Sequence, residues 1–187
     1  SDVINHIVKL KPDFIFHLAA SAYVPYSFDH PLEVNEANTI GTLNILEATK
    51  MIPNLKRIIC TSSSEVYGSA QTKSINESHP LNPTSPYAAS KVAADRYCYS
   101  YMKTYNLPIT IIRPFNTYGP RHTYDVVPKF IKMALSNLDI TVHGDGKQSR
   151  DLTYVSDAVE AFLKVGASKK TNQKVINFGT GKHHNII

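Results

Sequence analysis

Short apolar runs alternate along this chain with longer segments in which apolar and polar residues mix. The runs at 13–20 and 107–113 are nearly continuous and rich in isoleucine, leucine and phenylalanine. Such runs are typical of strands buried on both faces of a parallel sheet. Two further strands are predicted at 56–61 and 175–178, and a short one at 140–142.

The segments between these runs predict helices. We expect one at 2–9, a long one that Pro31 opens and that runs from 32 to about 51, and others at about 87–105, 126–136 and after the polar-apolar stretch 148–157. Regular alternation of strands and helices is typical of an α/β fold built on a doubly wound parallel sheet. Loops are expected at 21–31 and 69–86, and turns at 113–121 and 179–181.

Composition narrows the class of protein. The chain has 187 residues, of which 42% are hydrophobic and 19% charged, as in a soluble globular protein with a sizeable core. We find neither an apolar run of membrane-spanning length nor a signal-peptide pattern, so we predict a cytoplasmic protein without a membrane partner. The net charge of +5 is scattered, which argues against nucleic-acid binding and suits a substrate that carries a diphosphate.

Cysteine and histidine give little reason to expect a metal. Cys60 lies in a strand-like run and Cys98 in a helix-like run, as free thiols of a reducing compartment do. The eight histidines form no H-E-x-x-H pattern, and no C-x-x-C is present. We therefore predict no metal site.

One pair of residues could carry proton chemistry. Tyr87 and Lys91 are four residues apart in a predicted helix and would lie on the same face. A lysine ammonium beside a phenol lowers the tyrosine pKa and makes the phenolate a general base for a hydroxyl proton. In isolation, this spacing would more often mark a pair on a solvated helix.

A polar cluster precedes that pair. Ser62, Ser63, Ser64 and Glu65 come directly after the predicted strand 56–61. Ligands of open α/β sheets bind at the carboxyl ends of the strands. This cluster is therefore expected to line a ligand site, although a surface carboxylate near a strand end is the alternative for Glu65.

Four motifs in order extend the pattern over nearly the whole chain: H-L-A-A at 17–20, S-S-S-E-V-Y-G at 62–68, Y-A-A-S-K at 87–91 and R-P-F-N-T-Y-G-P-R at 113–121. Together they resemble the extended short-chain dehydrogenase/reductase family, specifically its nucleotide-sugar epimerases and 4,6-dehydratases. The resemblance implies NAD as cofactor, a nucleotide-diphosphate sugar as substrate, and a homodimer formed through the helix that carries Tyr87 and a neighbouring helix.

The resemblance also implies roles for single residues. Tyr87 would take the proton of a sugar hydroxyl, Lys91 would tune Tyr87 and hold the nicotinamide ribose, and Ser63 would bond to the sugar oxygen. The implied catalytic residues are Ser63, Ser64, Glu65, Tyr87 and Lys91. The implied cofactor-binding residues are Leu18, Ala19, Ala20, Asn38, Ser62, Tyr87, Lys91 and Phe115, and the implied substrate-binding residues are Tyr23, Asn116, Arg121 and Arg150. For Arg150, a pair with Asp151 or Asp157 is the alternative.

Glu65 separates the reactions that the family performs. Ser63-Ser64-Glu65 is similar to the T-S-E form of GDP-mannose-type 4,6-dehydratases and differs from the T-D-E form of the dTDP-glucose enzymes. In those dehydratases the glutamate removes the C5 proton, whereas 4-epimerases generally lack an acid at this position. The resemblance therefore favours a 4,6-dehydratase, with a 4-epimerase as the alternative.

One expected motif is missing. No G-x-G-x-x-G follows a strand anywhere in the chain. The resemblance implies that this phosphate loop precedes Asp2 and that the substrate-binding lobe continues past Ile187. We therefore expect a partial dinucleotide-binding domain at 1–138 and a partial substrate lobe with returning segments at 139–187. This fragment alone could be inactive, and a truncated, non-catalytic nucleotide-sugar-binding module is the alternative from another class.

Overall fold

A four-stranded parallel sheet lies at the centre of the molecule in a computed structural model that describes residues 2–142 and 144–186. Its order is β1 (Phe14–His17), β2 (Arg57–Thr61), β3 (Ile109–Pro114) and β7 (Val175–Phe178). Each strand lies in one of the four segments predicted at 13–20, 56–61, 107–113 and 175–178, so the presence of a strand in each is confirmed. The register aligns Ile58 of β2 with Ile15 on one side and Ile109 on the other.

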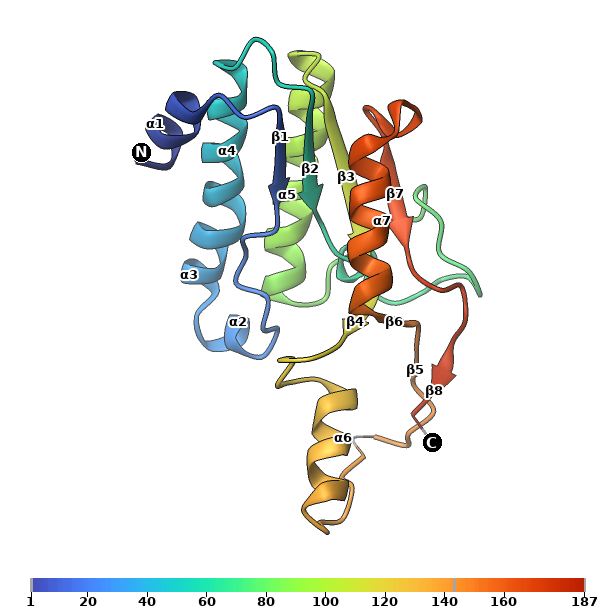
Figure 1. Cartoon of the computed structure of the whole chain (residues 1–187). Helices are drawn as coiled ribbons and strands as arrows, with labels where there is room; N and C mark the ends of the chain where they lie inside the picture. The colour runs from blue at the N-terminus through green and yellow to red at the C-terminus, as the bar shows by residue number, and fades with distance from the viewer. Residues whose placement is uncertain (1, 143, 187) are drawn as a thin grey trace.

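Helices cover both faces of this sheet, as Figure 1 shows. On one face α4 (Gly41–Lys50) and α5 (Pro86–Thr104) lie together, with α1 (Asp2–Leu10) outside α4, and on the other lies α7 (Val155–Ala167). Alternate strand residues therefore enter two different layers, because successive side chains point to opposite faces. The predicted doubly wound α/β fold is confirmed.

The main core lies between the sheet and the α4–α5 layer. Its buried side chains come from both helices and from the middle strands: Leu46, Ile52, Leu55, Ile58, Cys60, Cys98, Met102, Ile109 and Ile111. Both cysteines are free and buried in this core, as predicted. No helix in the described part of the chain is long and apolar enough to cross a membrane.

The long helix predicted after Pro31 consists of three consecutive segments. They are α3 (Pro31–Asn35), a π-helical turn η1 (Glu36–Ile40) and α4. Pro31 occupies the first turn, where its missing N–H costs no hydrogen bond. The preceding loop also contains a short helix, α2 (Tyr26–Asp29). The π turn contains Asn38, and such turns recur at functional sites.

Smaller elements extend beyond the carboxyl ends of the sheet strands. Strand β4 (Asn116–Tyr118) pairs with β6 (Leu152–Tyr154), and β5 (Ser149–Arg150) pairs with β8 (His184–Asn185). Helix α6 (Val126–Leu135) projects away from the sheet (Figure 1). The described part of the chain also contains two 3₁₀ turns, η2 (Ser64–Tyr67) and η3 (Lys169–Thr171). The domain boundary at residue 138 stays a prediction.

Two expectations about strands are wrong. Residues 140–142 form no strand, because no partner strand in the described chain pairs with them. The first run is strand only at Phe14–His17, and it is not buried on both faces, since Phe14 is 43% and Phe16 39% exposed. The reason is that α7 packs mainly on β2 and β3, and in the described residues β1 pairs with β2 alone.

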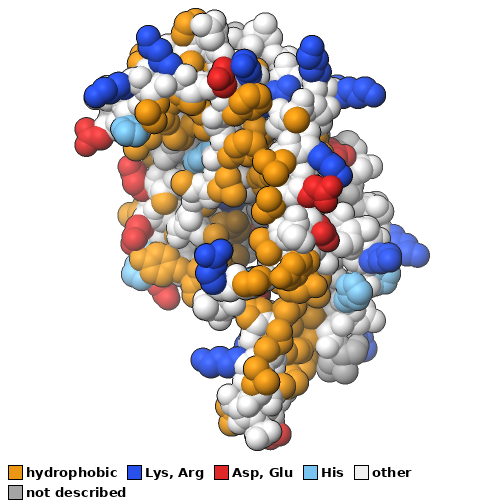
Figure 2. All heavy atoms as spheres, viewed as in Figure 1, with side chains coloured by type: hydrophobic (Ala, Val, Ile, Leu, Met, Phe, Trp, Pro, Cys, Tyr) orange, Lys and Arg blue, Asp and Glu red, His pale blue; other side chains and the backbone are white. Residues whose placement is uncertain are grey.

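One face of the molecule carries exposed apolar side chains along α7 and α6. Figure 2 shows hydrophobic side chains running from the sheet over the α7 face to α6. Val155, Val159 and Leu163 share one face of α7, and Ile131 and Leu135 belong to α6; all five are exposed. Spacings of four residues place such side chains in a stripe along a helix.

Candidate active site

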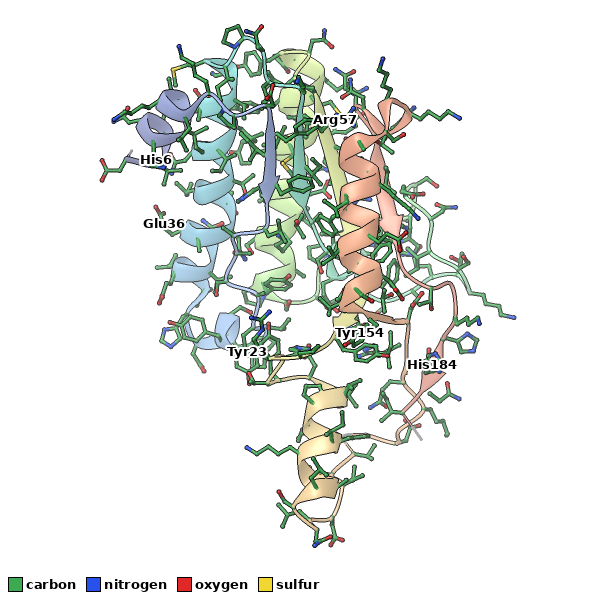
Figure 3. All side chains as sticks on the ribbon, in the orientation of Figure 1. His6, Tyr23, Glu36, Arg57, Tyr154 and His184 are labelled. Carbon is green, nitrogen blue, oxygen red and sulfur yellow. The ribbon has the colours of Figure 1, made fainter. Side chains whose placement is uncertain are left out.

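The site is built where the carboxyl ends of β2 and β3 meet the start of α5. Ser85 caps this helix by accepting a hydrogen bond from the N–H of Ala88, at 3.1 Å, and Pro86 follows at the first helical position. Both are preferred residues at a helix N-terminus. Tyr87 therefore emerges from the first turn of a well-capped helix. Figure 3 shows Tyr23 and Tyr154 at this end of the molecule and Arg57 at the opposite end.

Tyr87 and Lys91 are both buried on the predicted common face, 8% and 5% exposed. Tyr87 shares a hydrogen bond with the hydroxyl of Ser63. Lys91 Nζ donates to the carbonyl oxygen of Thr61, at 2.6 Å. The two motifs that sequence reasoning singled out are thereby joined at one place.

The predicted pKa of Tyr87 is wrong in direction. Burial raises the pKa of the phenol, which outweighs the hydrogen bond from Ser63, and the nearby carboxylates of Glu65 and Asp125 raise it further. Burial also lowers the pKa of Lys91, since a charged ammonium loses hydration there. The expectation failed because it considered the pair and not the loss of water around it.

The serine cluster forms the tight turn η2. Ser63 caps it, its Oγ accepting from the N–H of Glu65 at 3.2 Å. Val66 and Tyr67 are completely buried while Glu65 is exposed. Gly68 ends the turn at φ +66°, where a Cβ would lie 1.9 Å from the carbonyl oxygen of Asn82. The turn therefore directs Glu65 outward and fits closely against the loop that follows.

Glu65 faces a cleft of about 620 Å³. Five residues predicted for the site line this cleft: Ser64, Glu65, Phe115, Asn116 and Arg150. Arg150 is exposed, and in the described chain it makes no ion pair with Asp151 or Asp157; its guanidinium donates to the carbonyl oxygen of Ser149. Asp151 instead accepts from the N–H groups of Thr180 and Gly181, at 2.9 and 2.8 Å.

Sequence reasoning missed several residues of the cleft. Lys73 comes from the loop after η2, and Lys182 and His183 follow the G-T-G turn. With Arg150, the two lysines bring positive charge to the cleft, which suits phosphate groups. Their positions in surface loops gave no periodic signal, although Lys182 directly follows a recognisable turn.

Other predicted residues lie outside this cleft. Leu18, Ala19 and Ala20 are exposed where β1 ends. Tyr23 packs against Tyr124, with ring centroids 5.1 Å apart. Arg121 has φ +69° and lines a second groove, of about 590 Å³, between α6 and Tyr154.

Asn38 and Ser62 use their polar groups within the protein. The Asn38 amide accepts from the N–H of Ser21 at 2.7 Å and donates to Ser90 Oγ at 2.9 Å. Ser62 Oγ donates to Asp95 at 2.7 Å. Both residues therefore brace the walls of the site, and their contact with a cofactor stays a prediction.

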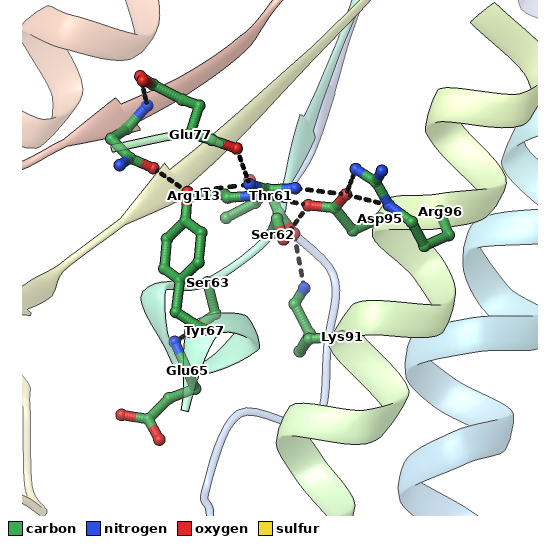
Figure 4. Close-up of polar contacts among 11 residues, drawn as sticks. Thr61, Ser62, Ser63, Glu65, Tyr67, Glu77, Lys91, Asp95, Arg96 and Arg113 are labelled. Atoms are coloured by element: carbon green, nitrogen blue, oxygen red, sulfur yellow. Dashed lines mark hydrogen bonds and ion pairs between the residues drawn. The ribbon is translucent and has the colours of Figure 1, made fainter. Parts of the chain in front are cut away.

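A buried ion pair lies behind the site (Figure 4). Arg113 binds Asp95 through two hydrogen bonds, Nε to Oδ2 at 2.8 Å and Nη2 to Oδ1 at 3.0 Å. Burial alone would raise the pKa of Asp95, but the Arg113 guanidinium holds it below its usual value. The spacing of Tyr87, Lys91 and Asp95, four residues each, was the available signal for this pair.

His17 is a second buried group whose pKa is shifted. Its Nε2 is 2.9 Å from Thr42 Oγ1, whose own hydrogen is donated to the carbonyl oxygen of Asn38 at 2.6 Å. The hydroxyl therefore accepts from His17, which must carry its proton on Nε2. Burial, aided by the charge of Lys91, lowers the pKa of His17 to about 4.

This shift predicts a pH-dependent loss of stability. Between about pH 6.5 and pH 4 the unfolded chain binds a proton at His17 that the folded chain does not, so stability falls as the pH falls. We expect this group to account for about 3 kcal/mol across that window. Urea unfolding of the complete protein and of His17→Gln should show a difference in stability that narrows toward acid. A difference that stays constant with pH would contradict this assignment.

The chain is similar to known proteins in its sequence and in its structure. The family model described as GDP-mannose 4,6 dehydratase matches residues 1–187. The human dTDP-D-glucose 4,6-dehydratase is 37% identical over 190 residues, which cover 98% of this chain and 53% of that protein. The chain thus spans about half the length of this curated relative.

Two solved structures show the same arrangement. A UDP-N-acetylglucosamine 4-epimerase from Methanobrevibacter ruminantium, in complex with UDP-N-acetylmuramic acid, has a TM-score of 0.91 and 37% identity, over 100% of this chain and 60% of that one. A UDP-glucuronic acid 4-epimerase from Bacillus cereus, in complex with UDP-glucuronic acid and NAD, has a TM-score of 0.92 and 32% identity, over 100% and 59%.

Proposed function

This chain belongs to the NAD-dependent epimerase and dehydratase family of extended short-chain dehydrogenases/reductases, and we propose that the complete protein is a nucleotide-sugar 4,6-dehydratase. The observation that carries the proposal is the position of Glu65. Its turn directs it into the cleft beside Asn116 and Phe115, while its neighbour Ser63 bonds to Tyr87. A carboxylate is therefore available beside the tyrosine that this family uses on the sugar.

The edge of the sheet fits a nicotinamide cofactor. Leu18, Ala19 and Ala20 are exposed and two of them are small, which permits close approach at the carboxyl end of β1. NAD bound there would accept the hydride of the sugar C4 carbon and later return it. The residues that would hold it are these three together with Lys91 and Phe115.

Tyr87 and Ser63 are proposed to handle the proton of the sugar hydroxyl. The Ser63 hydroxyl is close enough to the Tyr87 phenol to lower its pKa, so one sugar oxygen could contact both groups. Because burial raises the Tyr87 pKa, loss of the phenol proton requires positive charge nearby. The buried ammonium of Lys91, one helical turn further along α5, is a source of that charge.

Glu65 is proposed to act after C4 becomes a ketone. The C5 proton is then acidic, and the carboxylate can remove it and pass it to the C6 hydroxyl, which leaves as water. The hydride would then return to C6, and a proton from solvent would be added at C5. Arg150, Lys73 and Lys182, which line the cleft, would bind the diphosphate.

A 4-epimerase is the second proposal. It is supported by the two solved epimerases, which match this chain over its whole length. An epimerase would return the hydride to the opposite face of the ketone and would not need Glu65 as a base. A non-catalytic nucleotide-sugar-binding module is a third alternative.

The proposal also includes a second copy of the chain as partner and a cellular compartment. Tyr97 is 42% exposed on α5 and is proposed to contribute to a homodimer surface formed through α5 and its neighbour α4. Two buried free thiols support a cytoplasmic, reducing location.

The test is a substrate panel. The complete gene product would be incubated with NAD and with UDP-, GDP- and dTDP-sugars, and each product weighed by mass spectrometry. Loss of one water from one sugar is expected. An unchanged mass with a changed sugar configuration would replace the dehydratase with the epimerase, and no turnover at all would favour the binding module.

A further inference from the structure

We propose that Tyr67 is a positioning residue for Glu65, because its hydroxyl fastens the turn that carries Glu65 to the buried Asp95–Arg113 pair. The inference rests on the proposed function in one respect, that Glu65 is the base. Tyr67 itself is fully buried and does not line the cleft, although its hydrogen-bond partner Asn177 does. It would act through the turn.

The contacts of Tyr67 are complete and specific. Its side chain is fully buried, and its OH donates to Asn177 Oδ1 at 2.6 Å and accepts from Arg113 Nη1 at 2.9 Å. The Arg113 guanidinium also lies 5.0 Å from the centre of the phenol ring, and His79 meets the ring edge-on. One hydroxyl therefore joins η2 to both β3 and β7.

The same ion pair holds the other half of the site. Asp95 lies on α5, two turns after Tyr87, and also accepts from Ser62 at the end of β2. Figure 4 shows this connection from Tyr67 through Arg113 to Asp95, with Lys91 on the same helix. The turn with Glu65 and the helix with Tyr87 are thus fixed to one common point.

Glu65 depends on this anchor because its own side chain is otherwise unsupported. In residues 2–142 and 144–186 its carboxylate makes no hydrogen bond or ion pair, and its backbone N–H is held only by Ser63. Its location follows from the backbone of a single 3₁₀ turn. Loss of the Tyr67 hydroxyl would leave Asn177 Oδ1 without its donor and Arg113 Nη1 with only the carbonyl oxygen of Glu77, at 3.4 Å.

The experiment compares Tyr67→Phe with Tyr101→Phe in the complete protein. Both changes remove one hydrogen-bonded hydroxyl, since Tyr101, further along α5, donates to Glu47 of α4. Amide hydrogen exchange is measured by mass spectrometry on peptides from η2 and from α5. Tyr67→Phe should exchange about tenfold faster in η2, with α5 unchanged, as expected for loss of one buried hydrogen bond. No acceleration in η2, or equal acceleration in both peptides, would overturn the proposal.

The second readout is catalytic. Water loss by Tyr67→Phe should fall about tenfold in kcat with little change in KM, while reduction of NAD by the sugar stays within about twofold of the unsubstituted protein. Equal loss in both steps would mean general damage and would overturn a specific role. If the unsubstituted protein removes no water from any sugar, the proposed function fails, and the exchange measurement still decides whether Tyr67 positions the turn.

Discussion

Replacement of Arg113 by methionine in the complete protein is expected to lower the free energy of unfolding by about 3–5 kcal/mol. Arg113 is 2% and Asp95 2% exposed, so the change leaves a carboxylate buried without its main counter-charge. Asp95 would keep the hydroxyl of Ser62 and the exposed side of Arg96, which cannot replace two hydrogen bonds from a buried guanidinium. Urea unfolding at neutral pH measures the loss.

A matched control uses the second arginine on the same carboxylate. The Arg96 side chain is 42% exposed, so Arg96→Met should cost less than about 1 kcal/mol. Replacing both buried partners, as Arg113→Met with Asp95→Leu, should recover part of the stability, since no uncompensated charge then remains. Equal, small losses for Arg113→Met and Arg96→Met would show that the buried pair does not anchor the site.

The sheet could be predicted from the sequence because its strands are short, apolar and β-branched. Arg57–Thr61 and Ile109–Pro114 lie in the middle of the sheet, where both faces are buried, so their composition reflects their position. Strand β1 shows the limit of this argument. Its composition is that of a central strand, yet in the described residues it pairs with β2 alone. Which neighbours a strand has cannot be read from its own residues.

The site was predictable where the chemistry is local in sequence. Ser63, Glu65, Tyr87 and Lys91 stand at fixed spacings after a strand or within one helical turn, so their convergence followed from the fold class. The link from Arg113 to Tyr67 joins residues 46 positions apart, and no local pattern announces it. The pKa of Tyr87 failed for a related reason, because burial depends on every segment that covers the phenol.

The largest catalytic effect is expected from Glu65→Gln in the complete protein. The amide keeps the size of the side chain but cannot remove a proton, so water loss should fall by about 10²–10⁴-fold. In the proposed mechanism, oxidation at C4 depends on Tyr87, Lys91 and Ser63, so it should continue. The variant should therefore reduce bound NAD on addition of the sugar and stall with the 4-keto sugar, whereas the unsubstituted protein passes through that state.

Exchange at C5 provides the sharper measurement. In deuterated water the unsubstituted protein should place deuterium at C5 of the product, and Glu65→Gln should not exchange this position in the 4-keto sugar that it accumulates. Glu160→Gln is the matched control, since Glu160 pairs with Lys164 on the exposed side of α7, and it should behave as the unsubstituted protein. Unaltered water loss by Glu65→Gln would exclude Glu65 as the base. The protein would then still be a dehydratase, and another group would have to remove the C5 proton.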